Sequence, residues 1–154
     1  MSSDHGSQLP GRVRVIIDTP RLSFLKRRDD GAIDFVSPLP SPFNYGSVPG
    51  TTSADGDRID AIVLGPRLPR GTEVERDVVA VARFVDAGVP DPKWVCADRP
   101  LGAADRALIN AFFAIYVRMK RALNAVRGRT GETRFDGLVE RDRAQFTARS
   151  RPCQ

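Results

Sequence analysis

The segment that decides the fold reads Ser53-Ala54-Asp55-Gly56-Asp57-Arg58-Ile59-Asp60-Ala61-Ile62-Val63-Leu64. Its second half, residues 59–64, is an almost uninterrupted apolar run, which predicts a buried strand. Because side chains alternate along a strand, Asp60 shares a face with Ile62 and Leu64. Burying an unpaired charge is costly in free energy. The segment therefore combines a core strand with a carboxylate that requires a partner.

The three carboxylates of this segment favour a divalent cation. Asp55 and Asp57 lie two residues apart, so they point the same way in an extended segment. Gly56 permits a bend that brings Asp60 towards them. Convergent carboxylates repel one another unless a cation holds them. Oxygen ligands with no nearby His or Cys favour magnesium, manganese or calcium over zinc or copper.

Two other interpretations compete with a metal site. An EF-hand loop does not fit, because Ile59 occupies a ligand position and no Glu closes the loop at the required spacing. A solvated acidic turn does fit, because Asp and Gly are common turn formers. The segment alone leaves the turn and the metal site as alternatives.

The chain has the length and composition of one soluble globular domain. Its 154 residues are 41% hydrophobic and 28% charged, which is ordinary usage. We therefore expect a single domain over residues 1–154, with flexible ends at 1–11 and 150–154. No apolar run approaches the roughly 20 residues of a membrane helix, and the polar N-terminus is unlike a secretory signal. These features predict a cytoplasmic protein that does not bind membranes.

Charge and cysteine content narrow the function only slightly. The net charge of +5 makes polyanions possible partners, but scattered arginines also suit a small, phosphate-rich substrate. The cysteines, Cys96 and Cys153, lie in a predicted core strand and in the polar tail. This placement does not suggest a disulfide framework.

Several strands are predicted before the midpoint of the chain and just after it. The β-branched residues 13–17 predict a strand that ends at Asp18, and the apolar residues 78–82 predict another. Residues 24–28 and 33–36 predict a hairpin around an Asp-Asp-Gly turn. We expect the proline-rich residues 37–51 to form a structured loop, since proline disfavours helices and central strands.

The C-terminal third predicts helices. Apolar side chains recur at three- and four-residue spacing from residue 108 to residue 123, which is typical of an amphipathic helix packed on a sheet, and Gly128 can end it. Tyr116 lies on or beside the apolar stripe, so it is either a core aromatic or a hydroxyl donor to a ligand. A shorter helix is expected over 136–149. Strands followed by helices indicate an α+β fold.

Two motifs follow one another along the chain. The first consists of Asn44-Tyr45-Gly46, Pro49-Gly50-Thr51, and Asp55-Gly56-Asp57 followed by Asp60. The second has the form D-x-x-x-x-D-x-K and consists of Asp86, Asp91 and Lys93. Together with Lys26 upstream and Tyr116 downstream, these motifs make residues 13–118 resemble the soluble, metal-dependent inorganic pyrophosphatases of family I.

The resemblance implies a fold and a reaction. The fold would be a small closed, OB-like five-stranded β-barrel flanked by one long and one shorter C-terminal helix. The reaction would be hydrolysis of inorganic pyrophosphate to two phosphates by a metal-activated water, with magnesium as the cofactor and manganese as an alternative. The enzyme would be a homo-oligomer, a hexamer in bacterial relatives, and nucleic acid is not expected as a partner.

The resemblance also implies roles for eleven residues. Asp57 would orient the attacking water and accept its proton. Positive or hydroxyl groups would contact the substrate phosphates, and carboxylates would hold the metal ions. The substrate-binding residues would be Lys26, Arg28, Tyr45, Lys93 and Tyr116, and the metal ligands Asp55, Asp60, Asp86, Asp91 and, through water where the family has Glu, Asp18.

The sequence departs from the family pattern around the phosphate site. Arg58 replaces a proline of the signature, and Val117 follows Tyr116 where relatives commonly have a lysine. Arg118 would substitute for that lysine if the helix were slightly rotated. No arginine occupies the family's phosphate-binding position, so Arg28 either supplies the missing charge or is a surface residue.

Two alternatives to a pyrophosphatase follow from these departures. The segment between residues 31 and 44 is shorter than in the family, which favours a hydrolase of the same fold that acts on another phosphoanhydride or phosphate ester. A non-enzymatic module that binds nucleic acid or a protein through an Arg-rich face is the other alternative. A binding module has no need of Asp57.

Overall fold

The computed structural model describes residues 9–27, 30–36 and 40–141. These residues form, in order, β1 (Arg12–Thr19), β2 (Leu25–Arg27), β3 (Ile33–Val36), β4 (Asn44–Val48), β5 (Ile59–Val63), β6 (Glu73–Asp86), β7 (Val89–Pro90), β8 (Lys93–Ala97), α1 (Ala103–Val126) and β9 (Arg134–Glu140). Among the described residues, no helix is both long enough and apolar enough to cross a membrane.

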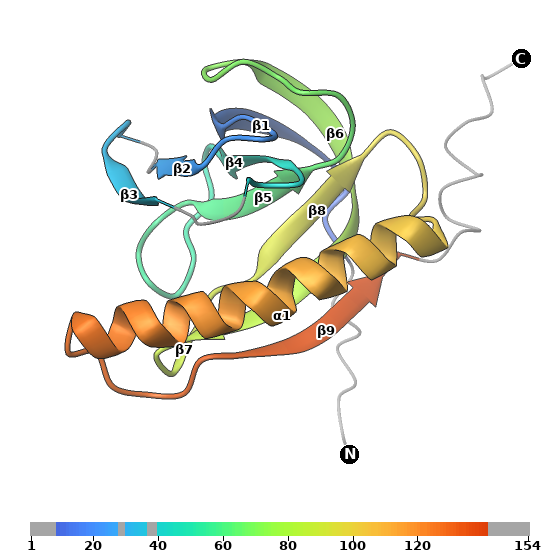
Figure 1. The fold of residues 1–154 in the computed structure, drawn as a ribbon. Helices are drawn as coiled ribbons and strands as arrows, with labels where there is room; N and C mark the ends of the chain where they lie inside the picture. The colour runs from blue at the N-terminus through green and yellow to red at the C-terminus, as the bar shows by residue number, and fades with distance from the viewer. Residues whose placement is uncertain (1–8, 28–29, 37–39, 142–154) are drawn as a thin grey trace, which may run out of the picture.

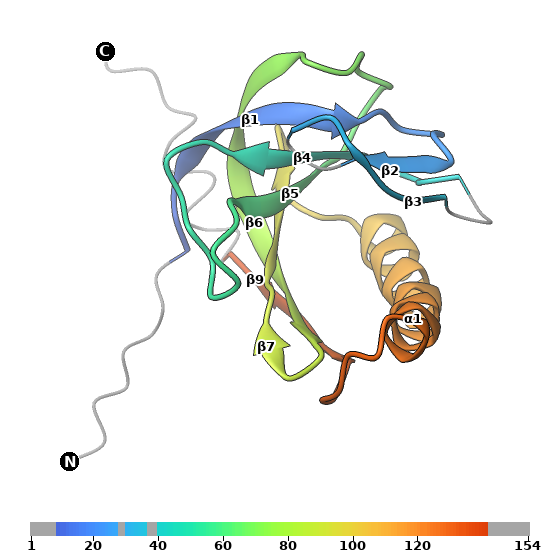
Figure 2. The same cartoon turned by 90° about the vertical axis from the view of Figure 1, so that its left-hand side faces the viewer.

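Five strands pair in a ring. The order is β1-β4-β5-β8-β6, and β6 pairs back with β1. The β5–β8 pair is parallel and the other pairs of the ring are antiparallel, so the sheet is mixed. Figures 1 and 2 show this curved sheet with α1 along one side of it. The α+β prediction with five ring strands is confirmed, whereas the stricter description as a closed, OB-like barrel stays a prediction.

Two hydrophobic clusters fill the structure. The first takes residues from all five ring strands, among them Val15, Val48 and Cys96, and none from α1, so it forms the interior of the ring. The second joins strand residues such as Ile62 to α1 residues such as Phe113. Neighbouring residues of β5 therefore contribute to opposite clusters, as the alternation of residues 59–64 predicts.

The long helix begins and ends where local signals place it. The backbone amide of Gly102 donates to the Asp105 carboxylate at 2.8 Å, which satisfies a backbone donor near the start of α1. At the other end the Arg127 amide bonds to the Leu123 carbonyl, and Gly128 takes a positive φ of 68°. The prediction of one long amphipathic helix ending near Gly128 is confirmed.

The prediction of a shorter C-terminal helix over residues 136–149 is wrong for the residues that the structure describes. Residues 136–140 belong to β9, which pairs with β6, and residues 142–149 lie outside the described residues. Phe135 and Leu138 lie three apart, which imitates helical spacing, yet both pack on the cluster beneath α1. A register shift in the β6–β9 pair and a positive φ at Gly137 let both side chains reach that one face.

The prediction of a loop over residues 37–51 is also wrong in part, because residues 44–48 form the fully buried strand β4. Prolines 42 and 49 flank this strand and do not interrupt it, so each ladder amide remains available. The hairpin prediction is confirmed by the antiparallel pairing of β2 with β3.

Gly46 marks the closest approach of two ring strands. A Cβ atom at this position would lie 2.2 Å from the Ile16 carbonyl oxygen and 3.0 Å from Val15 Cγ1. The obstacle is mainly the backbone of β1, which cannot move without disturbing the ring. The β1–β4 pairing therefore requires glycine here.

We expect Gly46→Ala to lower the free energy of unfolding by about 1–3 kcal/mol, because the added methyl group overpacks the β1–β4 pair. Urea unfolding followed by circular dichroism measures this change. The neighbouring Ser47→Ala is the control, since Ser47 Oγ is buried without a hydrogen-bond partner among the described residues, so its removal should not lower the free energy of unfolding. Equal stability of Gly46→Ala and the wild type would contradict the close approach.

Candidate active site

A polar cavity of about 340 Å³ lies where several ring strands end beside α1. Its walls carry six carboxylates together with lysine, arginine and tyrosine side chains. The residues predicted from the sequence that line it are Asp18, Lys26, Tyr45, Asp55, Asp57, Asp60, Asp86, Asp91 and Tyr116. Lys93 contacts two of these carboxylates. Arg28 lies outside the described residues.

Lys93 is the centre of the carboxylate cluster. Its ammonium lies 2.5 Å from Asp60 Oδ2 and 2.7 Å from Asp91 Oδ2, and only 1% of its side chain is exposed. The position follows from strand register, because Lys93 of β8 pairs with Asp60 of β5. Asp60 thus has the partner that its place on an apolar face requires.

The charges in this cluster stabilise one another. Burial alone would raise the pKa of Asp60, but Lys93 and Lys26 outweigh burial and hold this pKa below its ordinary value. Burial would likewise lower the pKa of Lys93, but the Asp60 charge reverses the effect and raises it. Both groups are therefore ionised at neutral pH.

Two tyrosines and Lys26 form the next layer of the site. Tyr45 Oη donates to Asp60 Oδ2 at 3.0 Å, and Lys26 Nζ donates to Tyr116 Oη at 2.9 Å. Burial and the Asp60 charge raise the pKa of Tyr45 well above its usual value, so this hydroxyl remains a neutral donor. Tyr116 is buried in the cluster beneath α1 while its hydroxyl lines the cavity, so it fits both roles considered for it.

Asp86 is held by a second set of polar groups. Its carboxylate lies 3.0 Å from Lys120 Nζ, 2.7 Å from Asn124 Nδ2 and 3.4 Å from Arg129 Nη1. Burial would raise the pKa of Asp86, but the hydrogen bonds from Asn124 and Lys120 keep it below its usual value. A second positive group therefore faces the cavity from α1.

The motifs in the sequence do not predict three residues of this set, Lys120, Asn124 and Arg129. Lys120 and Asn124 follow Tyr116 by four and eight residues, which places all three side chains on one face of the helix. This spacing is a signal that could have identified them. Arg129 follows the helix and carries no comparable local signal.

The acidic turn lies at the rim of the cavity. Asp55 and Asp57 are both exposed, and the Asp55 carboxylate accepts hydrogen bonds from Ser53 Oγ and from the Asp57 amide. Gly56 takes a φ of 87°, which supports the predicted bend. Across the described part of the chain, no three acidic, His or Cys side chains form a ready-made metal-binding group. The expected convergence on Asp60 is therefore not preformed.

The donor set nevertheless has the chemistry of a site for a metal ion bound by oxygen ligands. The six carboxylates offer oxygen ligands, and the residues that line the cavity include no His or Cys. Oxygen-only donors suit a hard divalent cation. The carboxylates on the rim and those paired with lysines face one shared space.

Comparison with known proteins identifies the family. The family model for inorganic pyrophosphatases matches residues 17–145. A curated inorganic pyrophosphatase of Aeropyrum pernix is 33% identical over 120 residues, which cover 72% of this chain and 64% of the relative. The corresponding protein of Haemophilus influenzae is 38% identical over 82 residues, covering 49% and 47%. The matches thus span about half to two thirds of these relatives.

Solved structures agree over more of the chain. The crystal structure of the inorganic pyrophosphatase from Thermus thermophilus has a TM-score of 0.70 and 27% identity, and covers 95% of this chain and 91% of that one. The inorganic pyrophosphatase of Helicobacter pylori gives a TM-score of 0.68 at 23% identity, covering 89% and 88%, and supports the fold. On the strength of the family match and the shared fold, the chain belongs to the inorganic pyrophosphatase family.

Proposed function

We propose that this protein hydrolyses inorganic pyrophosphate to two phosphates and requires magnesium. The observation that carries the proposal is the polar cavity in which six carboxylates face lysine and tyrosine donors. Pyrophosphate is a compact polyanion, so its hydrolysis needs positive charge on the phosphates and an activated water. The cavity offers groups for both tasks.

The carboxylates would divide between metal binding and proton transfer. Asp55, Asp60, Asp86 and Asp91 would hold magnesium, with Asp18 acting through water, and manganese is an alternative ion. Bound metal supplies Lewis acidity, which neutralises phosphate charge and lowers the pKa of a bound water. Asp57 stands on the exposed turn at the rim, where it would accept the proton of the attacking water.

The positive and hydroxyl groups would bind the phosphates. Lys26 would act as a point charge, and Tyr45 and Tyr116 as neutral donors. Lys93 would contact phosphate while it continues to neutralise its two carboxylates. Arg28 remains a candidate for the missing phosphate-binding arginine.

Lys120 compensates for one departure from the family pattern. Val117, which stands where relatives commonly have lysine, packs in the cluster beneath α1. Arg118 is exposed and lines a different cavity with Arg121 and Arg134, so the helix is not rotated to bring it to the site. Lys120 lies one turn beyond Tyr116 and lines the polar cavity. We assign to Lys120 the phosphate contact that Val117 cannot make.

A nucleic-acid-binding module is less well supported. Several arginines of the basic surface are paired with acidic neighbours, namely Arg99 with Asp105, Arg106 with Glu140 and Arg134 with Asp136. These pairs reduce the positive field that a polyanion would meet. We also propose, as part of the pyrophosphatase function, that the protein is cytoplasmic and assembles as a hexamer.

Asp57→Asn should abolish turnover while it preserves magnesium binding, because an amide of equal size keeps the turn but cannot accept a proton. Loss of a positioned base typically reduces the rate by about 10²–10⁴-fold. Asp60→Asn should weaken magnesium binding as well. The measurement is a magnesium titration of both variants, with calorimetry for binding and phosphate release for turnover.

Excess chelator sets the baseline of this experiment, and the wild type should release no phosphate in it. Asp98→Asn is the control variant, since Asp98 is exposed and pairs with Arg76 away from the cavity. Full hydrolysis in chelator would refute the metal requirement. Recovery of Asp57→Asn at higher magnesium would show that Asp57 is not the base.

Lys120→Met should raise the KM for pyrophosphate by about tenfold or more, since a hydrogen bond to a charged group contributes about 1.5–3 kcal/mol. Lys120→Arg should restore part of the affinity because it keeps the charge. The control is Arg118→Met on the exposed side of the same helix, which should leave the KM unchanged. Steady-state kinetics measures these values, with circular dichroism to verify folding. An equal KM in Lys120→Met and Arg118→Met would remove Lys120 from the site.

A further inference from the structure

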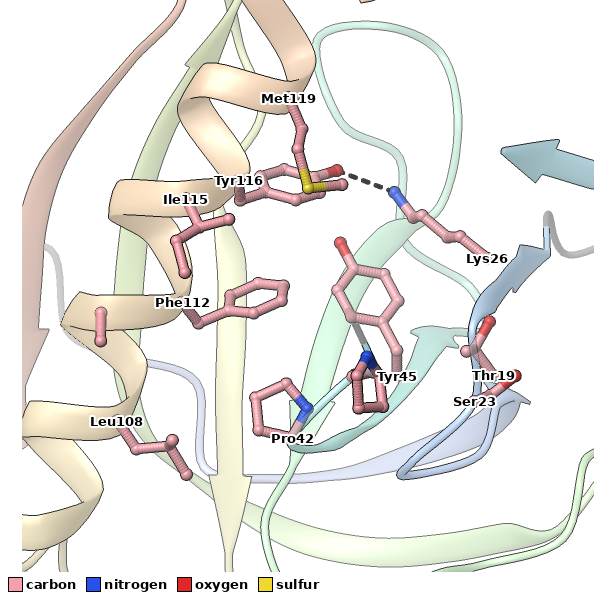
Figure 3. Close-up of a pocket in the computed structure, with 13 residues that line it drawn as sticks. Thr19, Ser23, Lys26, Pro42, Tyr45, Leu108, Phe112, Ile115, Tyr116 and Met119 are labelled. Atoms are coloured by element: carbon pink, nitrogen blue, oxygen red, sulfur yellow. Dashed lines mark hydrogen bonds between the residues drawn. The ribbon is translucent and has the colours of Figure 1, made fainter. Parts of the chain in front are cut away.

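A second cavity, of about 190 Å³, adjoins the polar one and differs from it in character. Apolar side chains of α1, including Leu108, Phe112 and Ile115, line it together with prolines 40 and 42. In Figure 3 the Phe112 ring projects from α1 towards Tyr45. Leu108 and Ile115 are still 44% and 43% exposed, so apolar surface remains open to solvent at this place.

The two cavities share a boundary of three residues. Lys26, Tyr45 and Tyr116 line both of them. Figure 3 shows the Lys26–Tyr116 hydrogen bond at one end of the apolar cavity, with the Tyr45 hydroxyl pointing towards it. The Lys26 ammonium also lies 4.9 Å from the centre of the Tyr45 ring. A ligand that reaches past these residues would meet phosphate donors on one side and apolar surface on the other.

Inorganic pyrophosphate makes no use of the apolar cavity, because it has no apolar part. Exposed apolar surface of this kind commonly marks a binding site. Its size indicates a small group, since a cavity of about 150 Å³ lined by apolar side chains is known to bind benzene. A single ring attached to a phosphate would therefore fit at the shared boundary.

We propose that the protein also binds and hydrolyses diphosphate monoesters whose organic group is a single ring or of similar size. The ring would occupy the apolar cavity, and the two phosphates would extend past Lys26 into the polar cavity. The placement of the phosphates rests on the proposed function. The preference for a ring rests on the apolar cavity and is measurable without turnover.

The reaction is the same hydrolysis at a different leaving group. The oxygen of water forms a bond to the terminal phosphorus, and the bond between that phosphorus and the bridging oxygen breaks. The bridging oxygen stays on the organic phosphate, so the products are one inorganic phosphate and one organic monophosphate. The proton of the water passes to Asp57 and then to solvent, and no oxidant or reductant is consumed.

The test compares two ligands whose phosphorus atoms are joined by a methylene group, so that neither can be cleaved there. One carries a phenyl ester and the other a methyl ester. With magnesium present, calorimetry should show that the phenyl compound binds about tenfold or more tightly, because a single methylene in an apolar pocket already discriminates by about 10–200-fold. Ala111→Phe should abolish this preference, since Ala111 lines the cavity and a phenyl side chain there would fill it.

Ala122→Phe is the matched control, because Ala122 is also exposed on α1 but lines neither of these two cavities. Its preference for the phenyl compound should equal that of the wild type. Equal affinities of the two ligands for the wild type would overturn the proposal, and so would a preference that survives Ala111→Phe. If equal affinities came with a change of oligomeric state in Ala111→Phe, the cavity would be a contact between copies of the chain.

Phosphate release separates this proposal from the previous one. If the wild type hydrolyses inorganic pyrophosphate but binds both ligands equally, the proposed function is supported and the organic substrate is ruled out. Wild type that prefers the phenyl ligand but releases no phosphate from pyrophosphate would lose the proposed function and retain the ring-binding cavity.

Discussion

The buried ammonium of Lys93 is the interaction on which the polar site depends. It lies within 2.7 Å of both Asp60 and Asp91, and its side chain is almost entirely buried. Two carboxylates at the end of a strand ring would repel each other without it. The parallel pairing of β5 with β8 places Lys93 directly beside Asp60, so strand register determines the electrostatics of the site.

From this centre the site extends outward through two further lysines, each of which contacts polar or aromatic partners. Lys26 lies against the ring of Tyr45 and bonds to Tyr116, and Lys120 pairs with Asp86. These internal pairs offset the charges of the cavity before any ligand binds. Substrate phosphates and cations would replace some of these partners on binding. The same Lys26 boundary separates the polar cavity from the apolar one.

Local signals in the sequence predict β5, α1 and the hairpin, because alternation, helical periodicity and turn residues act over short distances. The helix prediction over residues 136–149 is wrong for β9, because a bulge at Gly137 gives Phe135 and Leu138 the spacing of a helix. The family motifs predicted the carboxylates of the cavity. The place of Lys120 could have been predicted from its helical spacing to Tyr116. The partner of Asp60 depends on the pairing of β5 with β8, which no local pattern encodes.

The stability of Lys93→Met as a function of pH tests the central role of this ammonium most directly. At pH 7 the variant should lose about 3 kcal/mol of unfolding free energy, because breaking a buried ion pair leaves charge unpaired. The folded pKa of Asp60 is depressed in the wild type, so the stabilising effect is present above the unfolded pKa of about 3.9 and disappears as the pH falls through the folded value. Without Lys93 the pKa of Asp60 should rise. Protonation of Asp60 at lower pH should then remove the unpaired buried charge and restore part of the stability of the variant. Urea unfolding from pH 7 to pH 4 should therefore show the difference between the two proteins shrinking, whereas a constant difference would mean that Lys93 contributes packing alone.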